Sequence, residues 1–417
     1  MRLFAFLMFA ASLCAQHDMS QMEGMQHMLH DMAAMAGDKS PMTASGTSFN
    51  PAATPMEMLH LKSGRWTLGL HGVLFLAEIQ QTGPRGHDKL ASVNWMMADA
   101  STKLGRGTFT VRTMLSLEPT TITNQRYPLL FQTGETAHGK PIIDGQHPHD
   151  FVMELAVQYT QAFGKSNRFW LYAAPVGDPA FGPVAFPHRA SAAELPQATL
   201  GHHLQDSTHI SNEVVTAGIS HGIFGVEASG FHGGEPNENR WNIDHGPIDS
   251  YSGRLTITPN PRWAAQVSAA RLAHPEQLEP GDQTRIGASI TNIRPFPNGE
   301  IATSLIWGRV HKTAGGDNLN GYTVESVARF RKSNYVTGRI EVDDKDELST
   351  GTQSLRGTIG AYTLGYTREV ARLPGLGAAV GANFTSYSMA ADVHKVYGQH
   401  PVSVMVFLRL RLRAWSF

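Results

Sequence analysis

From residue 65 to its end, the chain alternates apolar and polar residues with a period of two in one segment after another. In the last of these segments, 402–413, aliphatic residues alternate with a second set that ends in Arg409, Arg411 and Arg413. Successive side chains of a β-strand point to opposite faces, so this pattern predicts one aliphatic face and one face that needs water. A soluble sandwich would cover the aliphatic face with a second sheet, whereas a transmembrane barrel exposes it to lipid and turns the arginines into a wet lumen.

The connections between these expected strands favour the barrel. Long connections, such as 118–148 and 174–208, alternate with short ones, such as 103–106 and 164–167, along the whole pattern. Outer-membrane barrels have long outer loops and short periplasmic turns in this alternation, and the bacterial ones have an even number of strands. We therefore predict an all-β fold, an antiparallel transmembrane β-barrel of about 16 strands (roughly 12–18) over residues 65–417.

The N-terminal segment has a different character. After Met1 and Arg2 the residues are mostly apolar up to Leu13, which predicts a cleaved signal peptide over 1–15. Cys14 is the only cysteine, and a lipoprotein cysteine is the alternative, although Leu13 stands where such sites have a small residue. If Cys14 leaves with the signal peptide, the mature chain has no thiol, which suits an oxidising periplasm.

Residues 16–39 follow as a short helix or disordered arm in which methionines and histidines are interleaved. Thioether sulfur is a soft ligand and imidazole a borderline one, so the arm predicts a binding site for copper or silver ions. The candidate ligands are His17, Met19, Met22, Met25, His27, Met28, His30, Met32 and Met35, and Met56, Met58 and His60 extend the set within a linker over 40–64. The competing interpretation is that the methionines are flexible filler on an amphipathic helix.

Histidines also gather in two of the expected outer loops. His147 and His149 could hold one divalent ion from an extended backbone, and His202 and His203 could do so from a turn. The alternative is that these histidines are ordinary polar residues that pack the two loops together inside the pore mouth. Arg189 would fit such a loop-locking network equally well.

The chain ends in Trp415, Ser416 and Phe417, which resembles the C-terminal signal of bacterial outer-membrane barrels. That resemblance implies contact with outer-membrane lipid and recognition by the barrel-assembly machinery through Phe417. In the order of its parts, a signal, a Met- and His-rich arm and a barrel, the chain resembles the outer-membrane copper-resistance protein B family. Its loop blocks 145–150 and 188–209 look more like an uncharacterised group of outer-membrane proteins encoded near metal-resistance functions. These resemblances imply a barrel in the outer membrane, an arm in the periplasm and a periplasmic metal carrier as a possible partner.

Two non-enzymatic functions follow from these observations. In the first, the arm captures copper or silver ions and the barrel takes part in metal resistance. In the second, the protein is a general or anion-preferring porin, because a lumen rich in arginine would repel a free cation. The inward-facing arginines are Arg112, Arg254, Arg285, Arg329, Arg339, Arg409, Arg411 and Arg413. A net charge of −1 argues against a nucleic-acid partner.

An enzymatic alternative rests on His209 and Ser211. Two groups of outer-membrane lipid hydrolases carry such a His-x-Ser arrangement on their lipid-facing wall. A serine nucleophile needs a nearby imidazole as base and a third group to orient it, and the next expected strand offers only Glu227 as an acid. We therefore assign no catalytic residue and expect no enzyme.

Overall fold

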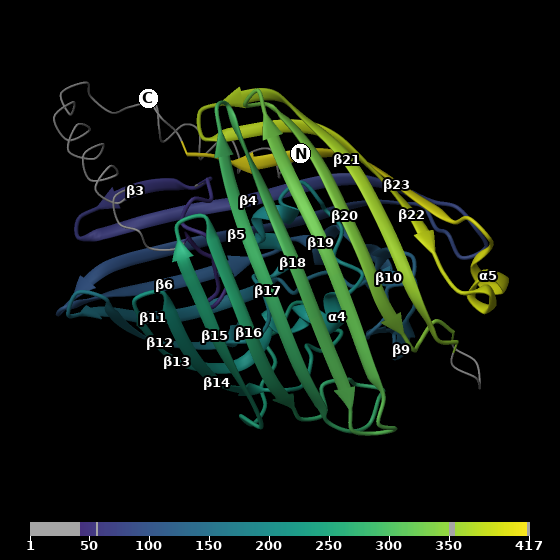
Figure 1. Ribbon diagram of the computed structural model, residues 1–417, viewed down its shortest axis with the longest axis horizontal. Helices are drawn as coiled ribbons and strands as arrows, with labels where there is room; N and C mark the ends of the chain where they lie inside the picture. The colour runs from purple at the N-terminus through teal and green to yellow at the C-terminus, as the bar shows by residue number, and fades with distance from the viewer. Residues whose placement is uncertain (1–41, 56, 350–354, 415–417) are drawn as a thin grey trace. The chain divides into compact units, whose positions relative to one another are not determined.

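The computed structural model describes residues 42–55, 57–349 and 355–414 of the chain. Sixteen antiparallel strands close into a barrel, each hydrogen-bonded to its neighbour along the chain. The last strand, β23 (Val402–Leu412), closes the barrel against β4 (Trp66–Gln81). Figure 1 shows this closure, with the purple β4 and the yellow β23 on the same side of the barrel. The expectation of an all-β barrel with about 16 strands is confirmed.

The wall continues from β4 through fourteen further strands before it reaches β23. They are β5 (Lys89–Leu104), β6 (Gly107–Leu115), β11 (Val152–Phe163), β12 (Asn167–Gly177), β13 (Ser211–His221), β14 (Phe224–His232), β15 (Ser250–Asn260), β16 (Trp263–Leu272), β17 (Gln283–Phe296), β18 (Gly299–Lys312), β19 (Asn318–Phe330), β20 (Asn334–Lys345), β21 (Gly357–Leu373) and β22 (Leu376–Ser388). A short strand, β3 (Leu59–Ser63), pairs with the start of β4. Among the described residues, no helix is long and apolar enough to cross a membrane.

Side chains of the wall point alternately out of the barrel and into it. On β23, Val404 and Val406 are exposed, whereas Met405, Phe407 and Arg409 are buried. Other strands continue the exposed apolar surface with Leu255, Val267, Ile286, Leu305, Val324, Ile340, Leu364 and Val380. The barrel therefore has an apolar outside and a polar inside, as the period-two pattern predicts.

The expected alternation of long and short connections is also confirmed. Turns of two or three residues join the strands at one end, at 105–106, 164–166, 222–223, 261–262, 297–298, 331–333 and 374–375. Longer loops join them at the other end, at 82–88, 116–151, 178–210, 233–249, 273–282, 313–317, 346–356 and 389–401, the last of which contains α5 (Ala391–Tyr397). The turn at 222–223 needs Gly222, whose φ of +57° is strained for residues with a Cβ.

The two longest loops fold back into the barrel. Loop 116–151 contains α3 (Glu118–Thr121), η2 (Thr123–Gln125), β7 (Tyr127–Pro128), β8 (Glu135–Ala137), β9 (Lys140–Ile142) and β10 (Gly145–Gln146). Loop 178–210 contains η3 (Phe186–His188), η4 (Ala190–Ala192), α4 (His202–Gln205) and η5 (Ser207–His209), and most of its residues are buried. Figure 1 shows α4 behind the green strands of the wall, where it packs against β18 and β19. The barrel interior is therefore filled by protein rather than by a wide open pore.

A third interior segment comes from the region expected as a linker. Residues 42–55 form a hairpin of β1 (Met42–Thr43) and β2 (Phe49–Asn50). The Ser45 hydroxyl donates to Asp178 Oδ2 at 2.7 Å. Arg254 Nη2 of the wall donates to Thr47 Oγ1 at 3.0 Å. This part of the linker is held inside the barrel, whereas the arm before it lies outside the described residues.

Candidate functional site

The arginines of the barrel interior are paired with carboxylates. All eight that the sequence places on the inward face lie within 4 Å of one: Arg112 with Asp99, Arg254 with Glu227, Arg285 with Glu235, Arg329 with Glu300, Arg339 with Glu325, Arg409 and Arg411 with Glu194, and Arg413 with Glu369. The interior therefore does not present eight free positive charges, and the argument that it would repel a cation loses its basis.

Several of these pairs fasten loop 178–210 to the wall. Glu325 of β19 is fully buried and accepts from Arg339 Nε of β20 at 3.0 Å. The same carboxylate lies 2.7 Å from Arg189 Nε of the loop and accepts from the Ser191 hydroxyl at 2.8 Å. Glu194 of the loop binds two arginines of β23. Arg189 thus takes part in a network that fixes the loop to the wall across the lumen, whereas the sequence alternative placed it between the two long loops.

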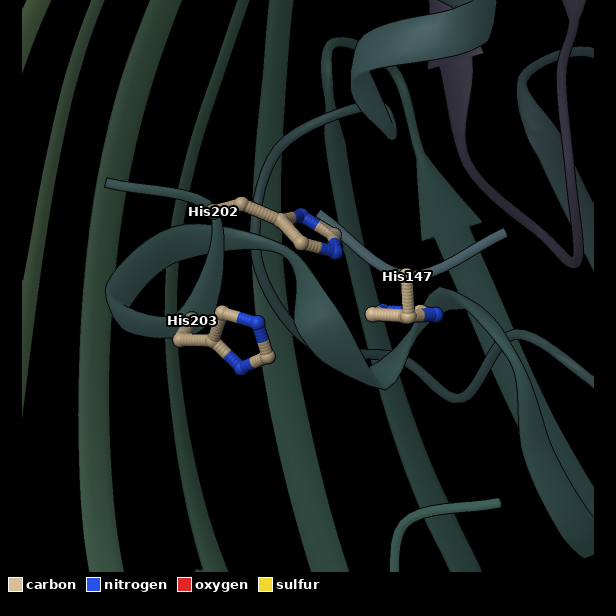
Figure 2. A group of neighbouring side chains, drawn as sticks. All are labelled: His147, His202 and His203. Atoms are coloured by element: carbon tan, nitrogen blue, oxygen red, sulfur yellow. The ribbon is translucent and has the colours of Figure 1, made fainter. Parts of the chain in front are cut away.

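Three histidines meet where the two folded-in loops touch. His147, His202 and His203 each offer a ring nitrogen within 4.8 Å of the others, and all three are buried. Figure 2 shows His202 and His203 on one helical turn, with His147 approaching from a separate segment. A second group of three possible ligands shares His203 and adds Glu135 and Glu235. Imidazole and carboxylate ligands at this spacing suit a divalent transition-metal ion such as Zn²⁺ or Cu²⁺.

Local geometry orients each ring. The short helix α4 places His202 and His203 next to each other, and His202 Nδ1 is hydrogen-bonded to Asp206 Oδ1 at 2.7 Å. His147 Nε2 lies 2.8 Å from Glu135 Oε1. Carboxylates in contact with metal-binding histidines commonly fix the ring orientation and the tautomer. The same contacts are also expected if these histidines only pack the two loops together.

Burial keeps two of these rings neutral. It lowers the pKa of His147 to about 4 and, with help from the neighbouring His202, that of His203 to about 3. At neutral pH both rings therefore carry a lone pair, which is the form that binds a metal. His203 Nδ1 is buried without a hydrogen-bond partner. His147 and His203 thus have the protonation state that a metal site requires.

His149 does not join this group. Its Nδ1 is 3.0 Å from Glu118 Oε1, and its ring stacks on Phe186. Burial opposes the charged form of the ring, but the Glu118 carboxylate outweighs it and raises the pKa of His149. His149 is not part of either group of neighbouring ligand atoms that includes His147 or His203. Of the four loop histidines that the sequence singles out, the structure brings three together.

An acidic cavity adjoins the three-histidine group. It has a volume of about 280 Å³ and is lined by Glu135, Glu235, Glu276, Glu279 and Glu347. Burial, together with the charge of Glu135, raises the pKa of Glu235 to about 8. Carboxyl groups that crowd in this way favour a proton or a cation between them. Cationic side chains already pair with these carboxylates: Arg240 with Glu135, Arg285 with Glu235 and Glu276, and Lys312 with Glu279 and Glu347, so the cavity does not present free negative charge.

Not every acidic cluster in this region is a candidate metal site. The oxygens of Glu279, Asp346 and Glu347 lie close enough together to hold an ion. However, the Lys312 ammonium lies between them, 2.6 Å from Glu279 and 2.8 Å from Asp346. This cluster is already neutralised by a side chain.

The other predicted ligands are elsewhere. His17, Met19, Met22, Met25, His27, Met28, His30, Met32, Met35 and Met56 lie outside the described residues. His60 is on β3, opposite Gly69 of β4, and the Met58 sulfur packs over that glycine. The metal-binding role of the arm stays a prediction.

His209 and Ser211 are not arranged as the lipid-hydrolase alternative expects. Both are buried inside the barrel rather than exposed on its outer wall. The Ser211 hydroxyl donates to the Thr208 carbonyl at 2.9 Å, and His209 Nδ1 is bonded to the Asp206 carbonyl. A lipid in the membrane would not reach this serine from the outer face.

Sequence reasoning missed the carboxylates of the site. Glu135 lies in a small hairpin of loop 116–151, and Glu235 lies in loop 233–249. They stand 100 residues apart in the chain, and neither belongs to a motif with the histidines. Only the folding of both loops over α4 brings them together.

No protein-family model and no curated protein sequence matches the chain. Among solved structures it is similar to an anion-selective porin from Comamonas acidovorans, with a TM-score of 0.52 at 11% identity over 83% of this chain and 100% of that one. It is also similar to the outer-membrane channel DcaP of Acinetobacter baumannii, with a TM-score of 0.50 at 9% identity over 85% of this chain and 100% of that one. The chain therefore has the fold of outer-membrane porins and channels. The resemblance to the copper-resistance protein B family is not confirmed by these comparisons.

Proposed function

We propose that the protein is an outer-membrane channel of the porin type, narrowed by segments of its own chain. The observation that carries this proposal is a closed barrel with an apolar outside and an ionised, polar inside, a combination that suits a wall between lipid and water. Loop 178–210, fastened through Glu325 and Glu194, would restrict passage. Outer-membrane lipid and the barrel-assembly machinery, through Phe417, would be its partners.

Ion conductance across a planar lipid bilayer tests this function. The wild-type protein should give small currents, because loop 178–210 occupies the lumen. Glu325→Gln should raise the conductance several-fold, since it removes the charge that holds Arg189 and Arg339. Glu300→Gln is the matched control, because its partner Arg329 lies at the turn end of the wall and not on the loop. Absence of current from wild type and Glu325→Gln alike would contradict the channel function.

A second candidate function is the handling of copper or silver ions. The observation that favours it is the three-histidine group, which lies beside an acidic cavity. In this function the Met- and His-rich arm captures the ion in the periplasm, and a periplasmic metal carrier could supply it. The ion is then the cargo of the protein rather than a resident cofactor.

Deletion of residues 18–35 separates the two functions in cells. If the arm serves metal handling, copper tolerance should fall while permeability to an uncharged solute stays unchanged. Unaltered tolerance would favour the channel alone. The metal affinity of the arm is measured directly by titrating a peptide spanning 17–35 with Cu(I) and Cu(II). A version with every methionine replaced by leucine serves as the comparison. Equal affinity of the two peptides would count against metal capture.

A further inference from the structure

A second cluster of potential ligands lies in the interior, separate from the three-histidine group. His71 of β4 and His188 of η3 have ring centroids 6.1 Å apart. His188 Nε2 is 3.0 Å from the sulfur of Met114 on β6. The indole of Trp95 on β5 lies beside both rings, with centroids 5.1 Å from His71 and 4.2 Å from His188. This cluster shares no residue with the first group and combines thioether, imidazole and indole.

Two of its nitrogens lack partners despite their burial. His71 is only 6% exposed, and its Nε2 has no hydrogen-bond partner. The Nδ1 of His188 is likewise buried and unpartnered. A buried polar atom without a hydrogen bond costs about 1–3 kcal/mol, so the free Nε2 of His71 calls for an explanation, whereas the nitrogen of His188 that faces Met114 is Nε2 and not Nδ1. Both rings line the same cavity, whose volume is about 130 Å³.

The sulfur of this cluster also stands out. Met97, Met114 and Met153 are at most 1% exposed and pack in one cluster on the inner side of β5, β6 and β11. Sulfur is a weak hydrogen-bond acceptor, so Met114 gives His188 little stabilisation as a partner. Toward a soft cation, however, thioether sulfur is a good ligand and imidazole a suitable second one.

We propose that His71, His188 and Met114, together with the face of Trp95, form a binding site for a soft monovalent cation, Cu(I) or Ag(I). Tetrahedral Zn²⁺, with nitrogen and sulfur at about 2.0 and 2.3 Å, holds these atoms about 3.5 Å apart, and the larger Ag(I) needs at least that separation. The 3.0 Å contact between His188 and Met114 must therefore open slightly, and the adjoining cavity gives the His188 ring room to turn. The indole of Trp95 adds attraction for a cation over its face.

The charged groups around the two interior sites predict that they prefer different metal ions. Glu135 and Glu235 accompany the three-histidine group, which suits a divalent ion. The groups in direct contact with His71 and His188, namely Trp95 and Met114, are neutral, and the arginines nearby, Arg112 and the cavity-lining Arg189 and Arg411, are each paired with a carboxylate. A monovalent ion with soft ligands is less costly to bury among neutral groups than a divalent one. This site extends beyond the channel function and does not depend on it.

Titration of the full-length protein in detergent with silver nitrate, in chloride-free buffer, tests the site. Tryptophan emission is the readout, and comparison with Trp95→Phe identifies the part of the emission change that comes from Trp95. The chain has no tryptophan before Trp66, and the Met- and His-rich arm is unchanged in every variant. We expect a quenching step in the wild type that disappears in Trp95→Phe.

The ligand variants decide the outcome. Met114→Leu and His71→Phe should each weaken the Ag(I) affinity of this step at least tenfold. Met153→Leu is the matched control, because it removes another thioether of the same buried cluster, whereas the sulfur beside His188 Nε2 is that of Met114. The proposal is overturned if the step persists unchanged in Met114→Leu and His71→Phe, or if Met153→Leu weakens it equally. Far-ultraviolet circular dichroism confirms which variants fold, and either ligand variant alone is sufficient for the test.

Discussion

The wall of the barrel and the loop that fills it are stabilised in different ways. On the wall, the outward positions require only an apolar side chain, and many residues of similar size fit them. In loop 178–210, by contrast, individual polar groups have particular partners. Glu194 pairs with two arginines, the backbone N–H of Leu200 donates to Glu341, and the backbone carbonyl of Leu200 accepts from Lys345. The wall therefore tolerates substitution within a class of residues, whereas the loop depends on specific pairs.

This difference has a functional meaning. Buried ion pairs stabilise less than hydrophobic contacts of the same volume, but they are strongly destabilising when one partner is removed. A loop held by such pairs has one well-defined position and a small number of points at which it can be released. The contrast between wall and loop can be tested by three substitutions, each with a matched control.

The largest effect should come from the loop. Glu194→Leu leaves the buried Arg409 and the half-buried Arg411 of β23 without their carboxylate partner, which should lower the free energy of unfolding by about 3–5 kcal/mol. Urea unfolding followed by tryptophan emission measures it. Glu213→Leu, whose carboxylate meets the exposed His245, is the control and should cost less than about 1 kcal/mol. If the two variants were equally stable, the loop would not depend on its buried pairs.

A charge on the outer wall should have the next largest effect. Leu364 lies near the middle of β21 and is 65% exposed on the outside. Leu364→Arg should destabilise the barrel by about 2–4 kcal/mol in phospholipid vesicles, because the guanidinium would enter hydrocarbon. Leu364→Ile keeps the surface apolar and should leave stability nearly unchanged. A tolerated arginine would mean that lipid does not cover this face.

The smallest effect on stability should come from replacing one of two neighbouring hydroxyl residues on β18. Ser304 points inward, is fully buried and can donate a hydrogen bond to the Ser191 hydroxyl of the loop, 2.7 Å away, whose own hydrogen is donated to Glu325. Ser304→Ala should cost about 1 kcal/mol of unfolding free energy. Thr303 points outward, and its hydroxyl lies 2.9 Å from that of Ser326, which keeps the Ala302 carbonyl as an acceptor when Thr303 is replaced. Thr303→Val should therefore change stability by less than about 0.5 kcal/mol. A larger loss from Thr303→Val than from Ser304→Ala would reverse the contrast between the inner and outer faces.

The candidate site could be predicted from the sequence only in part. Histidine is conspicuous in any loop, so His147, His202 and His203 could be named as possible ligands before the fold was known. Their grouping, the exclusion of His149 by Glu118, and the participation of Glu135 and Glu235 could not be predicted. The sequence also places His188 among the loop histidines, but its grouping with His71 and Met114 could not be predicted, because these two occur singly in ordinary strands.

The sequence by itself determined the wall of this protein: its strands, their inner and outer faces, and the order of long loops and short turns. These features repeat locally, because a strand alternates its side chains every two residues and each turn joins neighbours in the chain. Only the tertiary structure decided how the interior is filled. There Arg409 forms an ion pair with Glu194, which is 215 residues away in the chain. No local sequence pattern predicts which carboxylate pairs with which inward-facing arginine. Such pairs depend on the distance between atoms after folding, which spacing along the chain does not encode.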